Sequence, residues 1–285
     1  MFFNHLFHLN FKEKYMLHKI SDFHTHTSYC DGKSTPTEMA KRAYELGFTH
    51  LGFSGHGYTD FDQSYCMSRE ATEKYRLEIE KIKEKYDGKI CVLCGLEQDL
   101  FSTEPTTGYD YIIGSMHYIP YGGELLPIDS SKDRARKIIG ELFGGDFERF
   151  AVLYYKELAT LPQRVDASII GHFDLVTKYK CVLGLSPTES YYEAAFSCLD
   201  KLLKYSIPFE INVGAITRGY RTSPYPDRRI LEYIHRAGAD IVINGDTHTK
   251  ESLGKNLDIG IRLAKEVGFT ERVIFTNQGR IKIPL

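Results

Sequence analysis

A strand that leads through a loop into a capped helix decides the fold, and residues 19–47, KISDFHTHTSYCDGKSTPTEMAKRAYELG, show this unit first. The short run at its start predicts a strand. The helix has a clear beginning, because Thr35 can act as the N-cap with Pro36 at the first helical position and Glu38 at the third. Gly47 is typical of a helix end. The stretch therefore predicts one strand followed by one amphipathic helix.

The same alternation of apolar runs and helical periodicity continues along the chain. Alternating strands and helices predict a parallel sheet with right-handed crossovers. Seven or eight such units fit a closed barrel better than an open sheet. Strands are expected at 19–24, 49–54, 89–95, 111–115, 168–171, 208–212, 240–244 and 272–276, and further helices near 71–86, 131–161, 188–205, 226–237 and 255–267.

No Pro/Gly/Ser-rich linker or shift in composition divides the chain, so we expect a single α/β barrel domain over residues 16–285. Two Gly-Gly pairs, at 122–123 and 144–145, predict loops around a helical insertion. Residues 1–15 are interpreted as an extension from an upstream start, and we assign no function to it or to its histidines, His5 and His8.

The composition is that of a soluble globular protein, with 42% hydrophobic and 26% charged residues. Lys and Arg total 36 and Asp and Glu total 38, so the chain lacks the basic excess that most nucleic-acid binders carry. Its start has no apolar run near the roughly 18 residues that a membrane span needs. Six cysteines are too sparse for a secreted disulfide scaffold. We therefore expect a cytoplasmic protein without a nucleic-acid or membrane partner, and leave the oligomeric state open.

Histidines and acidic residues follow the predicted strands. The carboxyl ends of parallel barrel strands meet on one face, where active sites of this architecture lie. His, Asp and Glu without Cys form the ligand set of hydrolytic zinc, manganese or iron centres. At roughly four or five ligands per ion, the set suits two or three divalent or trivalent ions. The candidate ligands are His24, His26, Asp31, His56, Glu97, His117, His172, Asp246 and His248.

Other residues of the same types have a second interpretation. Asp31 lies in a loop, so the alternative to a ligand role is that it merely caps a turn. Asp174 could be either a ligand or a partner that orients an imidazole. Cys91 and Cys94 fall three apart on a predicted strand and so point to opposite faces, which favours packing over a shared metal. Three histidines are interpreted as structural: His18, His50, which we place before its strand, and His235.

The motifs that carry these residues resemble those of the polymerase and histidinol phosphatase (PHP) superfamily. Within it, the chain is most similar to the stand-alone histidinol-phosphate phosphatases, because Glu-Ile-Asn is followed by Arg218-Gly and by Tyr225-Pro-Asp227. The resemblance extends from about residue 20 to residue 268. The matching motifs are His24-Thr-His26, Ser54-Gly-His56, Gly95-Leu-Glu97, Gly114-Ser-Met-His117, Gly171-His-Phe-Asp174 and Asn244-Gly-Asp-Thr-His248.

The resemblance implies a distorted (β/α)7 barrel with three metal ions. It assigns a first ion to His24, His26, Glu97 and Asp246, a second to Asp31, His56 and His248, and a third to Glu97, His117 and His172, with Glu97 bridging. It also implies hydrolysis of L-histidinol phosphate to L-histidinol and phosphate in histidine biosynthesis.

Phosphate monoester hydrolysis needs a nucleophile at neutral pH and neutralisation of the phosphoryl charge, and divalent ions supply both, through a metal-bridging hydroxide and a clamp on the phosphoryl oxygens. Arg218 is a candidate phosphate fork, with a solvated loop arginine as the alternative. Ser115 is a second candidate substrate contact. Asp246 or His248 could protonate the leaving alkoxide. Acids and aromatics that could face a cationic leaving group are Asp60, Phe61, Asp62 and Tyr65.

Two alternatives remain open at this point. The same centre could act on another small phosphate ester or on a nucleotide. The metals could instead serve structure or regulation only, in which case the site would be closed, whereas a catalytic site keeps an open position.

Overall fold

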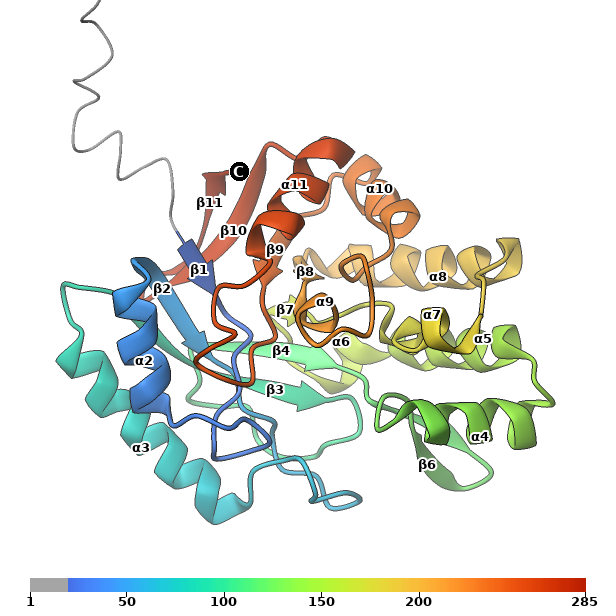
Figure 1. Cartoon of the computed structure of the whole chain (residues 1–285), viewed down its shortest axis with the longest axis horizontal. Helices are drawn as coiled ribbons and strands as arrows, with labels where there is room; N and C mark the ends of the chain where they lie inside the picture. Colours follow the sequence, from blue (N-terminus) through green and yellow to red (C-terminus); the bar gives the residue numbers. More distant parts are fainter. Residues whose placement is uncertain (1–19) are drawn as a thin grey trace, which may run out of the picture.

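The computed structural model describes residues 20–285, and a parallel sheet of seven strands forms its centre (Figure 1). The strand order is β1-β2-β3-β4-β7-β8-β9, and each neighbouring pair is parallel. The seven predicted strands from 19–24 to 240–244 are thereby confirmed. The expected extension 1–15 and His18 lie outside the described residues. The strands are β1 Ile20–Asp22, β2 Phe48–Phe53, β3 Cys91–Asp99, β4 Tyr111–Ser115, β7 Ile169–Ile170, β8 Phe209–Asn212 and β9 Ile241–Asn244.

Helices connect the strands and cover the outside of the sheet (Figure 1). The predicted start of the first helix is confirmed, because the Glu38 amide donates to Thr35 Oγ1 and the Thr35 amide donates to Glu38 Oε2. The helices are α2 Pro36–Glu45, α3 Arg69–Lys85, α4 Lys132–Phe143, α5 Phe147–Leu158, α6 Leu161–Arg164, α7 Lys180–Leu183, α8 Glu189–Leu202, α9 Gly214–Thr217, α10 Arg228–Arg236 and α11 Leu257–Val267, with 3-10 turns η1 Leu175–Thr177 and η2 Leu203–Tyr205.

The segment between β4 and β7 is an insertion that contains a hairpin as well as helices. The hairpin pairs β5, Tyr118–Tyr121, with β6, Glu124–Pro127, around the first Gly-Gly pair. The predicted helical region is confirmed, but it forms two helices, α4 and α5. The first helix ends where Gly144 adopts a left-handed conformation with φ of 65°. Sequence periodicity did not predict the hairpin, because its two strands are only four residues long.

The predicted strand at 272–276 forms, but it is wrong as an eighth member of the sheet. It is β10, Glu271–Thr276, and it pairs antiparallel with β11, Gly279–Pro284. The chain turns back after residue 276, so β10 bonds to its own continuation. This hairpin packs Val273, Ile274 and Phe275 against the inner face of the sheet.

Two apolar clusters lie on the two faces of the sheet. The inner one contains Tyr111, whose ring fits because Gly52 and Gly95 beside it have no side chain; a Cβ at either glycine would collide with it. The Tyr111 hydroxyl donates to the carbonyl of Phe23 at 2.6 Å, which satisfies its buried polar end. The larger cluster lies under the helices. Cys94 belongs to this outer cluster and Cys91 packs against the inner one, which confirms their opposite faces.

The first and last strands of the order lie side by side. A parallel bridge joins Thr25, after β1, to Thr247, after β9. The His26 amide donates to the Thr247 carbonyl at 2.8 Å, and the Thr247 amide donates to the His24 carbonyl at 2.9 Å. Motifs more than 200 residues apart in sequence therefore share one end of the sheet. Among residues 20–285, no helix is both long enough and apolar enough to cross a membrane.

Candidate metal centre

The carboxyl ends of the parallel strands bring all nine candidate ligands together. They surround and underlie a cavity of about 370 Å³. His24 and His26 are fully buried and contact Glu97, which lines the cavity. The other seven line it: Asp31, His56, Glu97, His117, His172, Asp246 and His248.

Glu97, at the carboxyl end of β3, is the centre of the cluster and is 1% exposed. Burial disfavours its charged form, but the surrounding imidazoles outweigh burial and hold the pKa of this carboxyl well below its usual range. Its two oxygens face five imidazoles: Oε2 lies 3.1 Å from His24 Nε2, 3.5 Å from His26 Nε2 and 3.1 Å from His56 Nδ1, and Oε1 lies 3.0 Å from His172 Nε2 and 3.4 Å from His117 Nε2.

Three buried atoms in this cluster fit a metal ion. His24 Nε2, His26 Nε2 and Glu97 Oε2 have no hydrogen-bond partner among the described residues. Buried polar atoms are nearly always partnered, so three such atoms that converge need an explanation. A cation would satisfy all three, since imidazole nitrogen and carboxylate oxygen are ligands for zinc, manganese and iron.

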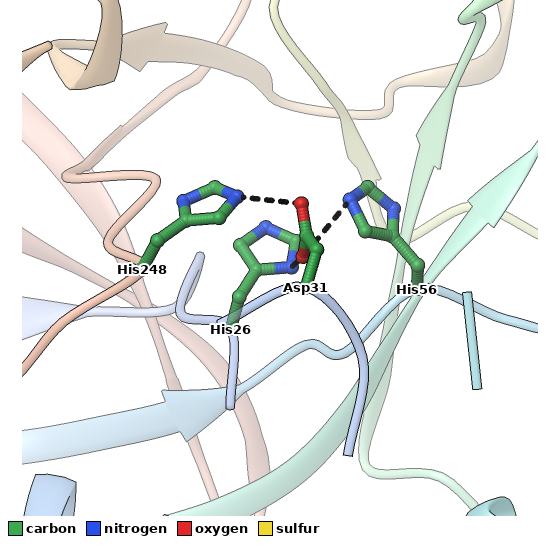
Figure 2. Close-up of side chains that lie close together, drawn as sticks. All are labelled: His26, Asp31, His56 and His248. Atoms are coloured by element: carbon green, nitrogen blue, oxygen red, sulfur yellow. Dashed lines mark hydrogen bonds and ion pairs between the residues drawn. The ribbon is translucent and has the colours of Figure 1, made fainter. Parts of the chain in front are cut away.

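A second group surrounds Asp31 at the edge of the cavity (Figure 2). Asp31 Oδ2 lies 3.2 Å from His248 Nε2, and Oδ1 lies 3.6 Å from His26 Nδ1 and 3.8 Å from His56 Nε2. A carboxylate that faces three imidazoles favours the ligand interpretation of Asp31 over a turn cap. His56 and His26 belong to this group and also reach Glu97, so the two groups are continuous.

The third group of potential ligands differs from the one that the resemblance implies. In the structure, His56 joins Glu97 and His117 within ligand distance. His172 is not in this group; its Nε2 lies 3.0 Å from Glu97 Oε1. Glu97 is common to both arrangements, which is consistent with a bridging carboxylate.

Asp246 is held in a strained backbone conformation, with φ of 48°. Non-glycine residues adopt this region when surrounding contacts enforce it, and such residues gather at functional sites. Asp246 Oδ1 lies 3.4 Å from His26 Nε2 and 3.9 Å from His24 Nε2, while Oδ2 accepts from Arg218 at 2.8 Å. The strained turn thus points one carboxylate at both the histidines and the arginine.

The surroundings of the imidazoles shift their pKa values in opposite directions. Burial and the neighbouring His248 and His56 lower the pKa of His26 to about 3, so it is neutral and has a lone pair for a cation. Burial also lowers the pKa of His24 and His117, but carboxylates outweigh burial and raise both well above the usual value. A metal ion bound among these carboxylates would displace those protons.

Two buried acids orient the histidines from behind, and the sequence analysis missed both. Glu210 Oε1 lies 2.7 Å from His24 Nδ1, and Glu210 Oε2 accepts from the His172 amide at 2.8 Å. Asp99 Oδ2 lies 3.2 Å from His117 Nδ1 and accepts its amide at 2.9 Å. Burial opposes ionisation of Glu210, but His24 outweighs it and lowers the pKa of that carboxyl. The sequence did contain a signal for both, because each is an acid on a buried strand: Glu210 lies two residues before Asn212 on β8, and Asp99 lies two residues after Glu97 on β3.

Replacement of Glu210 by Gln should weaken metal retention about 10- to 100-fold, because a carboxylate behind a ligating imidazole fixes its tautomer and raises its basicity. The measurement is metal content after dialysis against graded chelator, together with turnover. The exposed Glu193→Gln on α8 is the control and should behave as wild type. Unchanged metal retention in Glu210→Gln would contradict this role.

Arg218 lines the cavity, and its role as a phosphate fork stays a prediction. Its Nη1 donates to the Asp246 carbonyl at 2.9 Å and lies 3.0 Å from His248 Nδ1. Its side chain keeps 29% of its surface exposed. A second cation, Lys178, also lines the cavity and lies 2.9 Å from Asp129 Oδ2. Sequence periodicity did not indicate Lys178, since it follows a strand of only two residues.

Several expectations need correction. Ser115 is fully buried at the end of β4 and is not among the residues that line the cavity, so its role as a substrate contact stays a prediction; its Oγ lies where a side chain on Gly171 would be. Within residues 20–285, Asp174 joins none of the candidate ligand groups, and its carboxylate faces Arg221 and Thr177. His50 does not precede its strand but lies within β2.

The loop after β2 is only partly at the cavity. Asp62 and Tyr65 line it, and their place beside the leaving group stays a prediction. Phe61 instead packs edge-on against Tyr118, with ring centroids 4.9 Å apart, and Asp60 is exposed and absent from the lining. His235 packs against Phe269 at 4.7 Å, consistent with its structural interpretation.

A parallel α/β sheet whose strand ends hold histidines and carboxylates around an open cavity defines a protein with a candidate metal centre. The chain belongs to the PHP domain family, whose sequence model matches residues 22–213. That match contains the ligands from His24 to His172, and the Arg218, Asp246 and His248 segments follow it.

Curated relatives and solved structures agree with this family. A Schizosaccharomyces pombe protein named "Probable histidinol-phosphatase" is 24% identical over 82% of this chain and 81% of its own length. A Deinococcus radiodurans protein of the same name is 27% identical, over 87% of this chain and 94% of its own.

Two solved structures share the fold. A candidate histidinol phosphatase HisK from Listeria monocytogenes has a TM-score of 0.74 at 20% identity, covering 84% of this chain and 99% of that one. Histidinol phosphate phosphatase HisK from Lactococcus lactis, solved with zinc, L-histidinol and phosphate, has a TM-score of 0.65 at 19% identity, covering 92% and 99%.

Proposed function

We propose that this protein is a metal-dependent phosphomonoesterase that hydrolyses L-histidinol phosphate to L-histidinol and phosphate. The observation that carries the proposal is the convergence of nine candidate metal ligands at one cavity, which seven of them line together with Arg218 and Lys178. The relatives named as histidinol-phosphatases and the Lactococcus lactis HisK complex with zinc, L-histidinol and phosphate support the substrate.

We also infer that the sheet closes into a single distorted (β/α)7 barrel. The parallel bridge between Thr25 and Thr247 joins its two edge strands and supports closure. The inner apolar cluster, which the β10–β11 hairpin completes, supports it as well, since a barrel of this kind has a filled interior.

The proposal includes two or three zinc, manganese or iron ions. His24, His26, Glu97 and Asp246 would hold one, and Asp31, His56 and His248 a second. Glu97 and His117 would hold a third together with His172, as the resemblance implies, or with His56, which the structure brings within ligand distance. When bound, such ions lower the pKa of water and draw charge from the phosphoryl oxygens. An imidazole and carboxylate set accepts any of these metals according to supply.

The chain's own residues bind and orient the ester. The planar guanidinium of Arg218, whose Nη1 and Nη2 also donate to Asp246, would match two phosphate oxygens. Lys178, which is paired with Asp129, is the second cation that lines the cavity. Asp246 and His248, both in contact with Arg218, are the candidate donors of the proton that the departing alkoxide needs. Burial opposes ionisation of Asp246, but Arg218 outweighs burial and holds the pKa of that carboxyl well below its usual range, which favours His248 as the donor. The carboxylate of Asp62 and the ring of Tyr65 face the cavity on the leaving-group side, where they suit a cationic amine.

The dimensions of the cavity favour a small substrate over a polymer. A volume of about 370 Å³ is within the range of small-molecule sites, roughly 300–1,000 Å³. Because seven of the ligands line the open cavity, a closed structural metal site is disfavoured. Another small phosphate ester is the second candidate, because the metal centre and the two cations would recognise any phosphate.

A substrate panel combined with elemental analysis tests the proposal. Metal-replete protein should release phosphate from histidinol phosphate far faster than from nucleotides or sugar phosphates. Each rate is measured as kcat/KM, with chelator-stripped protein as the control, which should be inactive until metal is restored. Equal rates across the panel would favour the second candidate, and no turnover in metal-replete protein would contradict both.

A further inference from the structure

Two loops contribute the two cationic side chains, Lys178 and Arg218, that line the cavity. Residues 171–179 follow β7 and contain Lys178, and residues 213–227 follow β8 and contain Arg218. The loops touch at the cavity surface, where Lys178 Nζ lies 5.1 Å from the ring centroid of Tyr220. The relative position of these loops therefore sets the relative position of the two cations.

Beneath this surface, a buried ion pair joins the same two loops. Arg221 and Asp174 are both 0% exposed at their side chains, and Nη1 of Arg221 lies 3.4 Å from Oδ2 of Asp174. The same Nη1 donates to Thr177 Oγ1 at 2.7 Å. Asp174 Oδ2 also accepts from the Asp227 amide at 3.1 Å, so one carboxylate oxygen contacts both the middle and the end of the second loop.

Arg221 is also fixed within its own loop. Its Nη2 donates to the Pro224 carbonyl at 3.1 Å, and its guanidinium lies 4.2 Å above the centroid of the Tyr225 ring. The Tyr220 amide donates to the Ala215 carbonyl at 2.8 Å, which ties the loop to α9. The guanidinium therefore has one position available to it.

Stability alone does not explain this pair. Two charges buried away from water lose their hydration, and replacing such a pair by apolar residues is often neutral or stabilising. Arg221 contacts the Asp174 carboxylate through one nitrogen, whereas a guanidinium can donate to a carboxylate through two. Within residues 20–285, neither Arg221 Nε nor Asp174 Oδ1 has a hydrogen-bond partner. The contribution of the pair is then the geometry that it imposes.

Short backbone links connect each member of the pair to a cation. The Thr177 amide donates to the Asp174 carbonyl at 2.9 Å and the Lys178 amide to the Leu175 carbonyl at 2.8 Å, so Lys178 follows Asp174 through a tight turn. On the other side, Arg218 precedes Arg221 by three residues. A shift at the pair would therefore move both cations.

We propose that the Arg221–Asp174 pair is a positioning device that fixes the spacing between Lys178 and Arg218, so that both cations meet a single phosphate group. This rests on the proposed phosphatase function. Neither Arg221 nor Asp174 lines the cavity, so both would act through other residues.

The test uses the metal-loaded full-length protein and its Arg221→Met variant. Inorganic phosphate affinity by calorimetry and KM for histidinol phosphate should both weaken about tenfold, since small misplacement of a binding group is costly. Metal content should stay at the wild-type level. The matched control is Arg229→Met. Arg229 pairs with Glu189 at the surface, where 42% of its side chain is exposed, and its replacement should change none of these values.

A double-substitution cycle separates positioning from a merely structural role. If the pair acts through Lys178, Arg221→Met should weaken phosphate binding less in a Lys178→Met background than in wild type. Should Arg221→Met fail to fold, Thr177→Val breaks the 2.7 Å hydrogen bond and should weaken phosphate binding in the same direction.

Equal effects in both backgrounds, or loss of metal with unchanged phosphate affinity, would overturn the proposal. The calorimetric result does not depend on turnover. A protein that binds phosphate but fails to hydrolyse histidinol phosphate would contradict the proposed function and still decide the role of the pair.

Discussion

Glu97→Gln should reduce turnover of histidinol phosphate by about 10³-fold or more while the protein keeps its fold. Glu97 is the one acid in contact with five imidazoles of the centre, so no neighbouring carboxylate can replace it. An amide of the same shape removes the negative charge that those imidazoles and any shared ion require. The loss of several kcal/mol of charge stabilisation corresponds to that fold-change.

The measurement combines kcat with metal stoichiometry and circular dichroism. The control is Glu124→Gln, an exposed glutamate on β6, which should retain full activity. Full activity in Glu97→Gln would contradict the bridged centre. A change in the far-ultraviolet spectrum would assign the loss to folding instead.

Arg218→Ala should lower kcat/KM by about 10²-fold, with much of the effect in KM. Two charge-assisted hydrogen bonds to phosphate contribute about 3 kcal/mol together, which corresponds to that factor. The Ala variant also leaves the Asp246 carboxylate without its 2.8 Å partner. Arg218→Lys restores the charge but not the fork, so it should recover only part of the loss.

Steady-state kinetics at fixed metal loading measure this effect, with inorganic phosphate as the inhibitor. The control is Arg228→Ala on α10, an arginine that is 51% exposed and paired with Glu232. An unchanged kcat/KM in Arg218→Ala would remove Arg218 from the site and restore the interpretation of a solvated loop residue.

Much of the fold could be predicted from sequence because its signals are local. A capping box at Thr35 and Glu38 and short apolar runs between helices depend on neighbours within a few residues. The seven strands of the sheet were found in this way. The eighth predicted strand was assigned to the wrong partner, because an apolar run predicts extended backbone without saying which strand it pairs with.

The nine candidate ligands were also accessible from sequence, for a topological reason. Parallel strands place their carboxyl ends together, so a histidine or acid that follows each strand is brought to one place whatever the details of packing. The order of motifs then sufficed to place His24, Glu97 and His248 on one face of the barrel without knowledge of any distance.

Tertiary structure alone decided the residues that support this centre. Glu210 lies 186 positions from the His24 imidazole that it orients, and Arg221 lies 47 positions from Asp174. Buried polar groups find partners across strands and loops, according to register and loop path. These depend on the whole packed chain. Sequence by itself determined which side chains could bind metal, and the folded structure decided which acids and cations hold them in place.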